Sequence, residues 1–161
     1  MKNTELTGSI RGLLDEYKKA INELISVIKP LNFTQLSTVV NNETKDPDCK
    51  SIQTILAHSV ASGYSYSVYI ENSIGLDTSC PYDITFDNVN QYIEALNSMY
   101  DYCENVFKNN TIPEIEQIDN SKKIKTKWGQ QYDIEQLMEH AIVHILRHRR
   151  QIEKIIKRQS D

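Results

Sequence analysis

Cysteine is scarce in this sequence: only 3 occur among 161 residues, and no two of them form a C-x-x-C pair. Isolated thiols at Cys49, Cys80 and Cys103 predict neither a disulfide framework nor a cysteine-based zinc site, because both need paired thiols. The first eight residues also lack the apolar stretch of a secretory signal peptide. We therefore expect a cytoplasmic protein.

Positive charge is not in excess either, because 22 Asp and Glu outnumber 18 Lys and Arg and give a formal net charge of −4. A glycine-rich phosphate loop is also missing. The basic residues of the last segment follow acidic ones, which is the order that a helix dipole favours. With no aromatic residues interleaved among them, we do not expect a nucleic-acid partner. This basic cluster comprises Arg147, Arg149, Arg150, Lys154, Lys157 and Arg158.

No segment is apolar enough over its length to predict a membrane-spanning helix. The nearest is at about 50–72, where the stretch from Ser51 to Ile70 contains no Asp, Glu, Lys or Arg. Its serines, tyrosines, glutamine and histidine make it too polar for a bilayer core. We predict instead a helix that is buried on most sides of a bundle, in which Ser59 and Gly63 allow a neighbouring helix to approach closely.

Apolar residues recur with the 3.6-residue period of amphipathic helices in three further segments, at about 9–28, 87–108 and 133–156. Asp133 with Gln136 predicts a capping box at the start of the last of these. Strand signals are almost absent. We therefore predict an all-α fold, a four-helix bundle, in a single domain that covers residues 1–161.

The segments between these helices carry turn signals. A small hairpin is predicted between helices three and four, where the segments 115–118 and 123–128 flank Asp119-Asn120-Ser121. The other predicted connectors are a turn over 35–39 capped by Thr34, a polar loop at 41–50, and a connector at 75–85 around Pro81.

Three of the 4 histidines recur four residues apart in the last predicted helix, at His140, His144 and His148. This spacing places them along one side, with neighbours about 6 Å apart. Counted at about 100° per residue from the apolar stripe, His148 faces the interior, His144 lies at the border and His140 turns towards solvent. His140 and His148 lie about 12 Å apart along the axis, so His144 with His148 is the better metal clamp.

A third metal ligand must come from another segment. His58 has the same border position on the helix at 50–72 that His144 has on the last helix. Two alternatives stay open, since a lone histidine in a helix is more often a hydrogen-bonded core residue or a polar border residue. Neither histidine pair has the glutamate of the zinc-protease motif H-E-x-x-H. Under either alternative the histidines would be structural, and the protein would be a non-catalytic bundle.

The last helix reads His140-x-x-x-His144-x-x-x-His148-Arg149-Arg150-Gln151-Ile152 and follows an earlier helix with one histidine. This pattern resembles the DinB/YfiT-like superfamily, whose last helix often ends in a His-Arg-x-Gln-Ile run with Gly where this chain has Arg150. The lead-in from Trp128 to His140 looks like that of one bacterial branch. The resemblance covers nearly the whole chain in the order and length of its helices.

The resemblance implies a four-helix bundle, often dimeric and often with a long crossover between helices two and three, that binds one divalent ion. Carried onto this sequence, the ligands are His58, His144 and His148, the set that helix phase also selects. The family includes thiol S-transferases and isomerases that use low-molecular-weight thiols. We therefore expect a homodimeric, metal-dependent thiol S-transferase or hydrolase of a small substrate, with zinc or nickel and a low-molecular-weight thiol as candidate cofactors.

Three neutral imidazole ligands leave a metal ion its full charge and an open position for water or substrate. Such a site can lower the pKa of bound water to about 7 or hold a thiolate ready for attack. Gln151, one turn from His148, is expected to orient a ligand. The other residues that we expect around the site are Ser62, Tyr66, Tyr69 and His140; packing within the bundle is the alternative for the serine and tyrosines.

Overall fold

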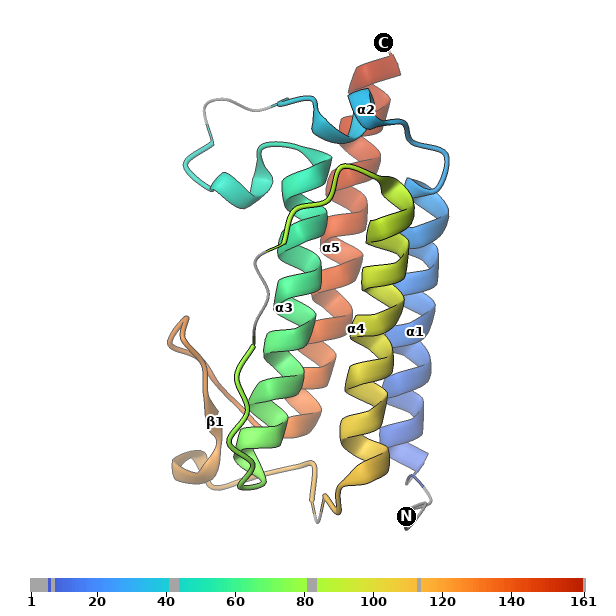
Figure 1. Cartoon of the computed structure of the whole chain (residues 1–161). Helices are drawn as coiled ribbons and strands as arrows, with labels where there is room; N and C mark the ends of the chain where they lie inside the picture. Colours follow the sequence, from blue (N-terminus) through green and yellow to red (C-terminus); the bar gives the residue numbers. More distant parts are fainter. Residues whose placement is uncertain (1–5, 7, 41–43, 81–83, 113, 161) are drawn as a thin grey trace.

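The computed structural model describes residues 6, 8–40, 44–80, 84–112 and 114–160. The predictions about the signal peptide and about Pro81 fall largely outside these residues. Four long helices run side by side (Figure 1). They are α1 (Gly8–Ile28), α3 (Ile52–Ser73), α4 (Val89–Asn109) and α5 (Ile134–Ser160).

α1 and α3 each contact both α4 and α5. The buried side chains of the four helices form one apolar core between them. The prediction of an all-α fold is confirmed, and each predicted long helix is found with ends within a few residues of the predicted ones. Among the described residues, no helix combines the length and the apolar character that crossing a membrane requires.

The path of the chain makes α3 and α4 parallel to each other and antiparallel to α1 and α5 (Figure 1). The segment that joins α3 to α4 therefore returns along the length of the bundle. A short helix, α2 (Phe33–Ser37), and a 3-10 helix, η1 (Pro47–Cys49), lie between α1 and α3. Because η1 contacts α3, part of the predicted polar loop lies directly against that helix.

Side-chain caps mark where several of the helices begin, and two of these caps test predictions. Asp133 accepts a hydrogen bond from the backbone of Gln136, whose side chain accepts one from the backbone of Asp133, so the predicted capping box is confirmed. At α2 the cap is Asn32, which forms a capping box with Gln35. The prediction that Thr34 is the cap is wrong, because asparagine two residues earlier satisfies the first free N–H groups better than threonine does.

A two-stranded antiparallel sheet lies between α4 and α5, but not around Asp119-Asn120-Ser121 as predicted. Strands β1 (Ile124–Lys125) and β2 (Gln131–Tyr132) pair with Ile124 opposite Tyr132. Gly129, at φ +86°, gives the turn between them its left-handed residue. The Asp119 carboxylate instead accepts a hydrogen bond from the backbone of Ser121, which favours the 3-10 helix η2 (Asn120–Lys122).

Neighbouring helices pack closely against α3 at Gly63. A Cβ added there would lie 2.0 Å from Sδ of Met99 on α4 and 2.8 Å from the hydroxyl oxygen of Tyr17 on α1. Ser59, one turn earlier, is 0% exposed and donates a hydrogen bond to the carbonyl of Ile55. The prediction of close approach by neighbouring helices is therefore confirmed at Gly63, and Ser59 is buried beside it.

Candidate metal centre

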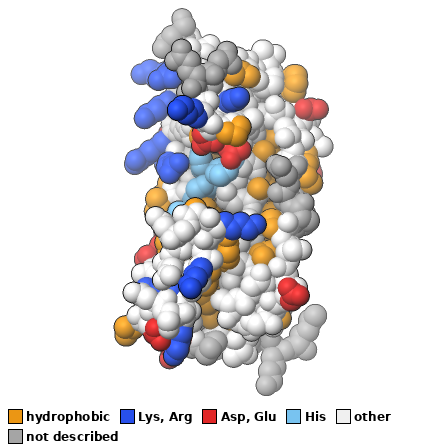
Figure 2. Space-filling model, turned by 90° about the vertical axis from the view of Figure 1, so that its left-hand side faces the viewer, with side chains coloured by type: hydrophobic (Ala, Val, Ile, Leu, Met, Phe, Trp, Pro, Cys, Tyr) orange, Lys and Arg blue, Asp and Glu red, His pale blue; other side chains and the backbone are white. Residues whose placement is uncertain are grey.

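Ring nitrogens of three histidines meet between α3 and α5. Nε2 of His144 lies 3.0 Å from Nε2 of His58 and 3.1 Å from Nε2 of His148. One ring nitrogen from each residue lies within 4.8 Å of the other two, close enough for all three to hold one metal ion. Histidine side chains reach the surface on this face, between acidic side chains and a column of lysines and arginines (Figure 2).

The two helices determine how these side chains meet. His144 and His148 lie one turn apart on α5, so their side chains project from the same side. His58 lies in the first half of α3, which packs against α5. His148 is 1% exposed, whereas the side chain of His58 is 31% exposed. The cluster therefore has a buried end at His148 and an open side at His58, and the interior position of His148 agrees with its helix phase.

The second ring nitrogen of two of these histidines has an oxygen partner. Nδ1 of His58 lies 3.1 Å from a carboxylate oxygen of Asp48, and Nδ1 of His148 lies 3.0 Å from Oε1 of Gln151. Partners of this kind fix the orientation and the tautomer of a metal-binding imidazole. Gln151 was expected near His148. Asp48 was missed, because only the packing of η1 on α3 brings this loop residue to the site.

The oxygen partners favour one tautomer of His58 and of His148. An ionised carboxylate and an amide oxygen accept hydrogen bonds, so these contacts favour a hydrogen on Nδ1 of both His58 and His148. In a neutral ring Nε2 then has no hydrogen and directs a lone pair at His144. Nε2 of His144 can donate to only one of these two. Converging lone pairs repel one another unless a cation lies between them, so the donor set fits a metal ion.

Burial favours the neutral form of His144 and His148. Loss of hydration, with smaller contributions from His148 and His58, lowers the pKa of His144 to about 2. Loss of hydration also lowers the pKa of His148 to about 4, although its contact with Gln151 raises it in part. Because metals bind neutral imidazole, His144 and His148 are already in the metal-binding form at neutral pH.

His140 is half-buried, so the prediction that it turns towards solvent is only partly correct. The ring of Trp128, in the hairpin turn, stacks on it at a centroid distance of 5.6 Å, and the hydroxyl of Tyr132 lies 3.3 Å from its Nδ1. Loss of hydration lowers the pKa of His140. Its ring also stacks on that of His144, at 6.1 Å, but it is not one of the three clustered histidines. Helix phase could not include a cover that comes from a separate hairpin.

The hydroxyl residues expected around the site differ in how close they lie to it. Oγ of Ser62 is 3.5 Å from Nε2 of His58. The ring of Tyr66 lies edge-on to that of His144 at 5.8 Å, and burial raises the pKa of Tyr66 to about 12. The hydroxyl of Tyr69 accepts a hydrogen bond from the backbone of the hairpin turn. Ser62 and Tyr66 thus border the histidines, and Tyr69 holds the hairpin.

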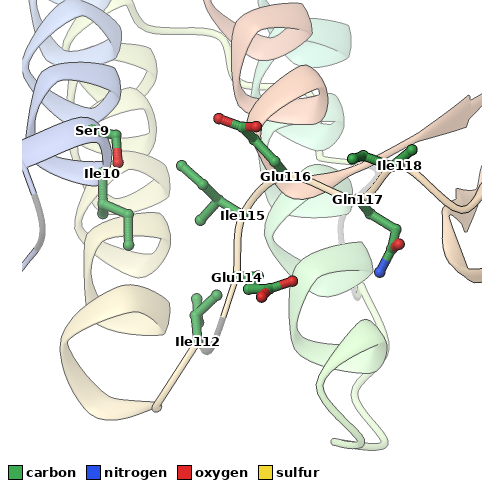
Figure 3. A pocket seen from close by; sticks show the side chains of 8 residues that line it. All are labelled: Ser9, Ile10, Ile112, Glu114, Ile115, Glu116, Gln117 and Ile118. Atoms are coloured by element: carbon green, nitrogen blue, oxygen red, sulfur yellow. The ribbon is translucent and has the colours of Figure 1, made fainter.

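No family model, curated protein or solved structure matches this chain. The functional argument therefore depends on the site itself. A separate hollow of about 520 Å³ lies at the end of the bundle near the start of α1 (Figure 3). The carboxylates that line it, from Glu114 and Glu116, point in different directions, and it contains no histidine or cysteine. The three histidines have the donor set better suited to a metal ion.

Replacing Asp48 by asparagine is expected to weaken metal binding about 10- to 100-fold. Asparagine can still accept from Nδ1 of His58, but it lacks the negative charge that makes the ring a better metal ligand. Competition with a chromophoric chelator measures the affinity. Asp101→Asn removes the same charge from α4, which carries none of these histidines, and should bind metal as wild type does. Wild-type affinity in Asp48→Asn would show that this carboxylate has no part in metal binding.

Proposed function

We propose that this protein is a metal-dependent enzyme of the DinB/YfiT-like superfamily, in which His58, His144 and His148 hold one divalent ion. The proposed reaction is thiol S-transfer or hydrolysis of a small substrate. The observation that carries the proposal is the convergence of three Nε2 atoms, together with the oxygen atoms of Asp48 and Gln151 that lie at Nδ1 of His58 and His148.

The arrangement of the helices supports the superfamily assignment. One histidine on the second long helix faces two on the last, and the chain between α3 and α4 returns along the bundle, as the resemblance implies (Figure 1). By the same resemblance we propose that the protein acts as a homodimer. The isolated cysteines and the apolar-poor start of the sequence support the proposal that it acts in the cytoplasm. Three imidazoles without a thiolate suit zinc or nickel.

A divalent ion held by three neutral imidazoles supplies an open coordination position and the charge to activate water or a thiol. The side chains around the cluster orient the metal-binding rings and contact the ligand. Asp48 and Gln151 orient the rings of His58 and His148. The hydroxyl of Ser62 can donate a hydrogen bond to a ligand on the open side of the cluster. Tyr66, whose pKa is raised to about 12, stays protonated at neutral pH and acts as a neutral group.

Metal analysis is the first test of this proposal. Protein purified without a histidine tag should contain about one zinc or nickel ion per chain, or take up about one on reconstitution. Removing the ion with a chelator should lower the melting temperature, because a ligand that binds only the folded state stabilises it. Failure to hold stoichiometric metal after reconstitution would contradict the proposal and leave a structural bundle.

The reaction is tested with metal-loaded protein, several low-molecular-weight thiols, and model electrophiles and esters. His144→Ala is the matched variant, since it keeps the rest of the bundle. Turnover by wild type above that of the variant is expected for thiol transfer or for hydrolysis. Equal background rates for both proteins on every substrate would support the alternative function, a non-catalytic metal-binding bundle.

A further inference from the structure

A groove of about 570 Å³ lies along the exposed side of α5, next to the metal centre. Two of its lining residues connect it to the histidines. Gln151 contacts His148, and Cys49 directly follows Asp48, which contacts His58. The remaining lining residues are Val143, Leu146, Arg147, Arg150 and Lys154.

Three side chains of this groove are positively charged: Arg147, Arg150 and Lys154. Their spacing of three and four residues puts them along one side of α5, over about 10 Å. All three are exposed, and none forms an ion pair within the part of the chain that the structure describes. Arg149, by contrast, pairs with Glu23 and with a second glutamate one turn along α5. The groove therefore holds three cations without a protein partner among these residues.

The helix dipole does not account for the positions of Arg147 and Arg150. Its effect is confined to the last turn of a helix, and α5 continues to Ser160, so that its last turn contains Lys157 and Arg158. Arg147 and Arg150 lie well before that turn. The sequence-based explanation of the basic cluster thus holds only for the residues at the end of the helix. Figure 2 shows lysines and arginines in a column beside the histidines.

We propose that this groove binds the anionic group, a carboxylate or a phosphate, of the substrate whose reacting atom lies at the metal centre. The inference rests on the function proposed above and adds the charge of the substrate. Guanidinium groups bind both anions through paired hydrogen bonds. Val143, which is 61% exposed, offers apolar contact for the rest of the molecule.

The size of the groove favours a small molecule over a nucleic acid. Its volume of about 570 Å³ lies within the range of small-molecule sites. The row of charge spans about 10 Å, and the formal net charge of −4 opposes binding of a long polyanion.

Calorimetric titration of the protein as purified, with its metal content measured, tests this inference. Inorganic phosphate and succinate serve as separate probes, and a preference for either one supports the proposal and identifies the anion. Arg147→Gln/Arg150→Gln is compared with Lys157→Gln/Arg158→Gln, which removes the same charge from the end of the same helix. All four side chains are exposed, so both variants should fold. We expect roughly tenfold or greater weakening in the groove variant and less than about twofold in the control.

Equal weakening in both variants, or no saturable binding of either probe to wild type, would overturn the proposal. So would tighter, salt-dependent binding of a single-stranded oligonucleotide that the groove variant loses, since this is the behaviour of a nucleic-acid site. Metal uptake, measured on the same samples, should be equal in wild type and both variants. If wild type binds the anion in the groove but takes up no metal, the metal-dependent function fails while the anion site stands.

Discussion

Alanine at His148 is expected to lower the affinity for the divalent ion by more than the 10- to 100-fold that follows from losing an orienting partner. The reason is that His148 supplies one of three convergent Nε2 atoms and is 1% exposed, so water does not easily replace it. His58→Ala and His144→Ala should cause comparable losses. Chelator competition and metal analysis measure the effect.

His140→Ala is the matched control for these variants. It removes an imidazole from the same helix, but one that lies under Trp128 and outside the cluster. We expect it to keep most of the metal affinity. Because His148 is buried, thermal denaturation must show that each variant is folded. Equal losses at His140 and His148 in folded protein would contradict the assignment of the ligands.

Valine at Gly63 is expected to destabilise the bundle by about 3 kcal/mol or more. Its first added carbon would already overlap Met99 and crowd Tyr17, and both of those side chains are fully buried. Neither can move aside without displacing other core residues. Urea denaturation followed by circular dichroism measures the change in the free energy of unfolding.

Gly12→Val provides the control, because Gly12 also lies inside a helix but its Cβ position meets no atom within 4 Å. The free energy of unfolding of this variant should stay within about 0.5 kcal/mol of wild type. Comparable destabilisation at both positions would mean that valine in a helix, rather than crowding between α1, α3 and α4, causes the loss.

Local periodicity predicted the long helices because an amphipathic helix depends on the spacing of its own residues. The same reasoning placed His148 in the interior and brought His58 and His144 to facing borders. It was only partly correct at His140, which is covered by Trp128 and Tyr132. What covers one side of a helix comes from segments distant in sequence, and periodicity within the helix contains no information about them.

Local sequence pattern also failed to predict the position of the hairpin and the role of Asp48. Two turn-forming stretches compete between α4 and α5, and the one with Gly129 became the hairpin because it has a residue suited to positive φ. Asp119 stabilised a 3-10 turn instead. Asp48 lies in a polar stretch with no periodic pattern, and only the docking of η1 on α3 places its carboxylate at His58.

The pairing of His58 with His144 also has a consequence for the order of events during synthesis. These residues are 86 positions apart in the chain, and the crossover, α4 and the hairpin lie between them. At a translation rate of about 5–20 residues per second, His58 leaves the ribosome roughly 4–17 s before His144 does. The three-histidine cluster can therefore close only after α5 has docked on α3, and its closure marks the completion of the bundle.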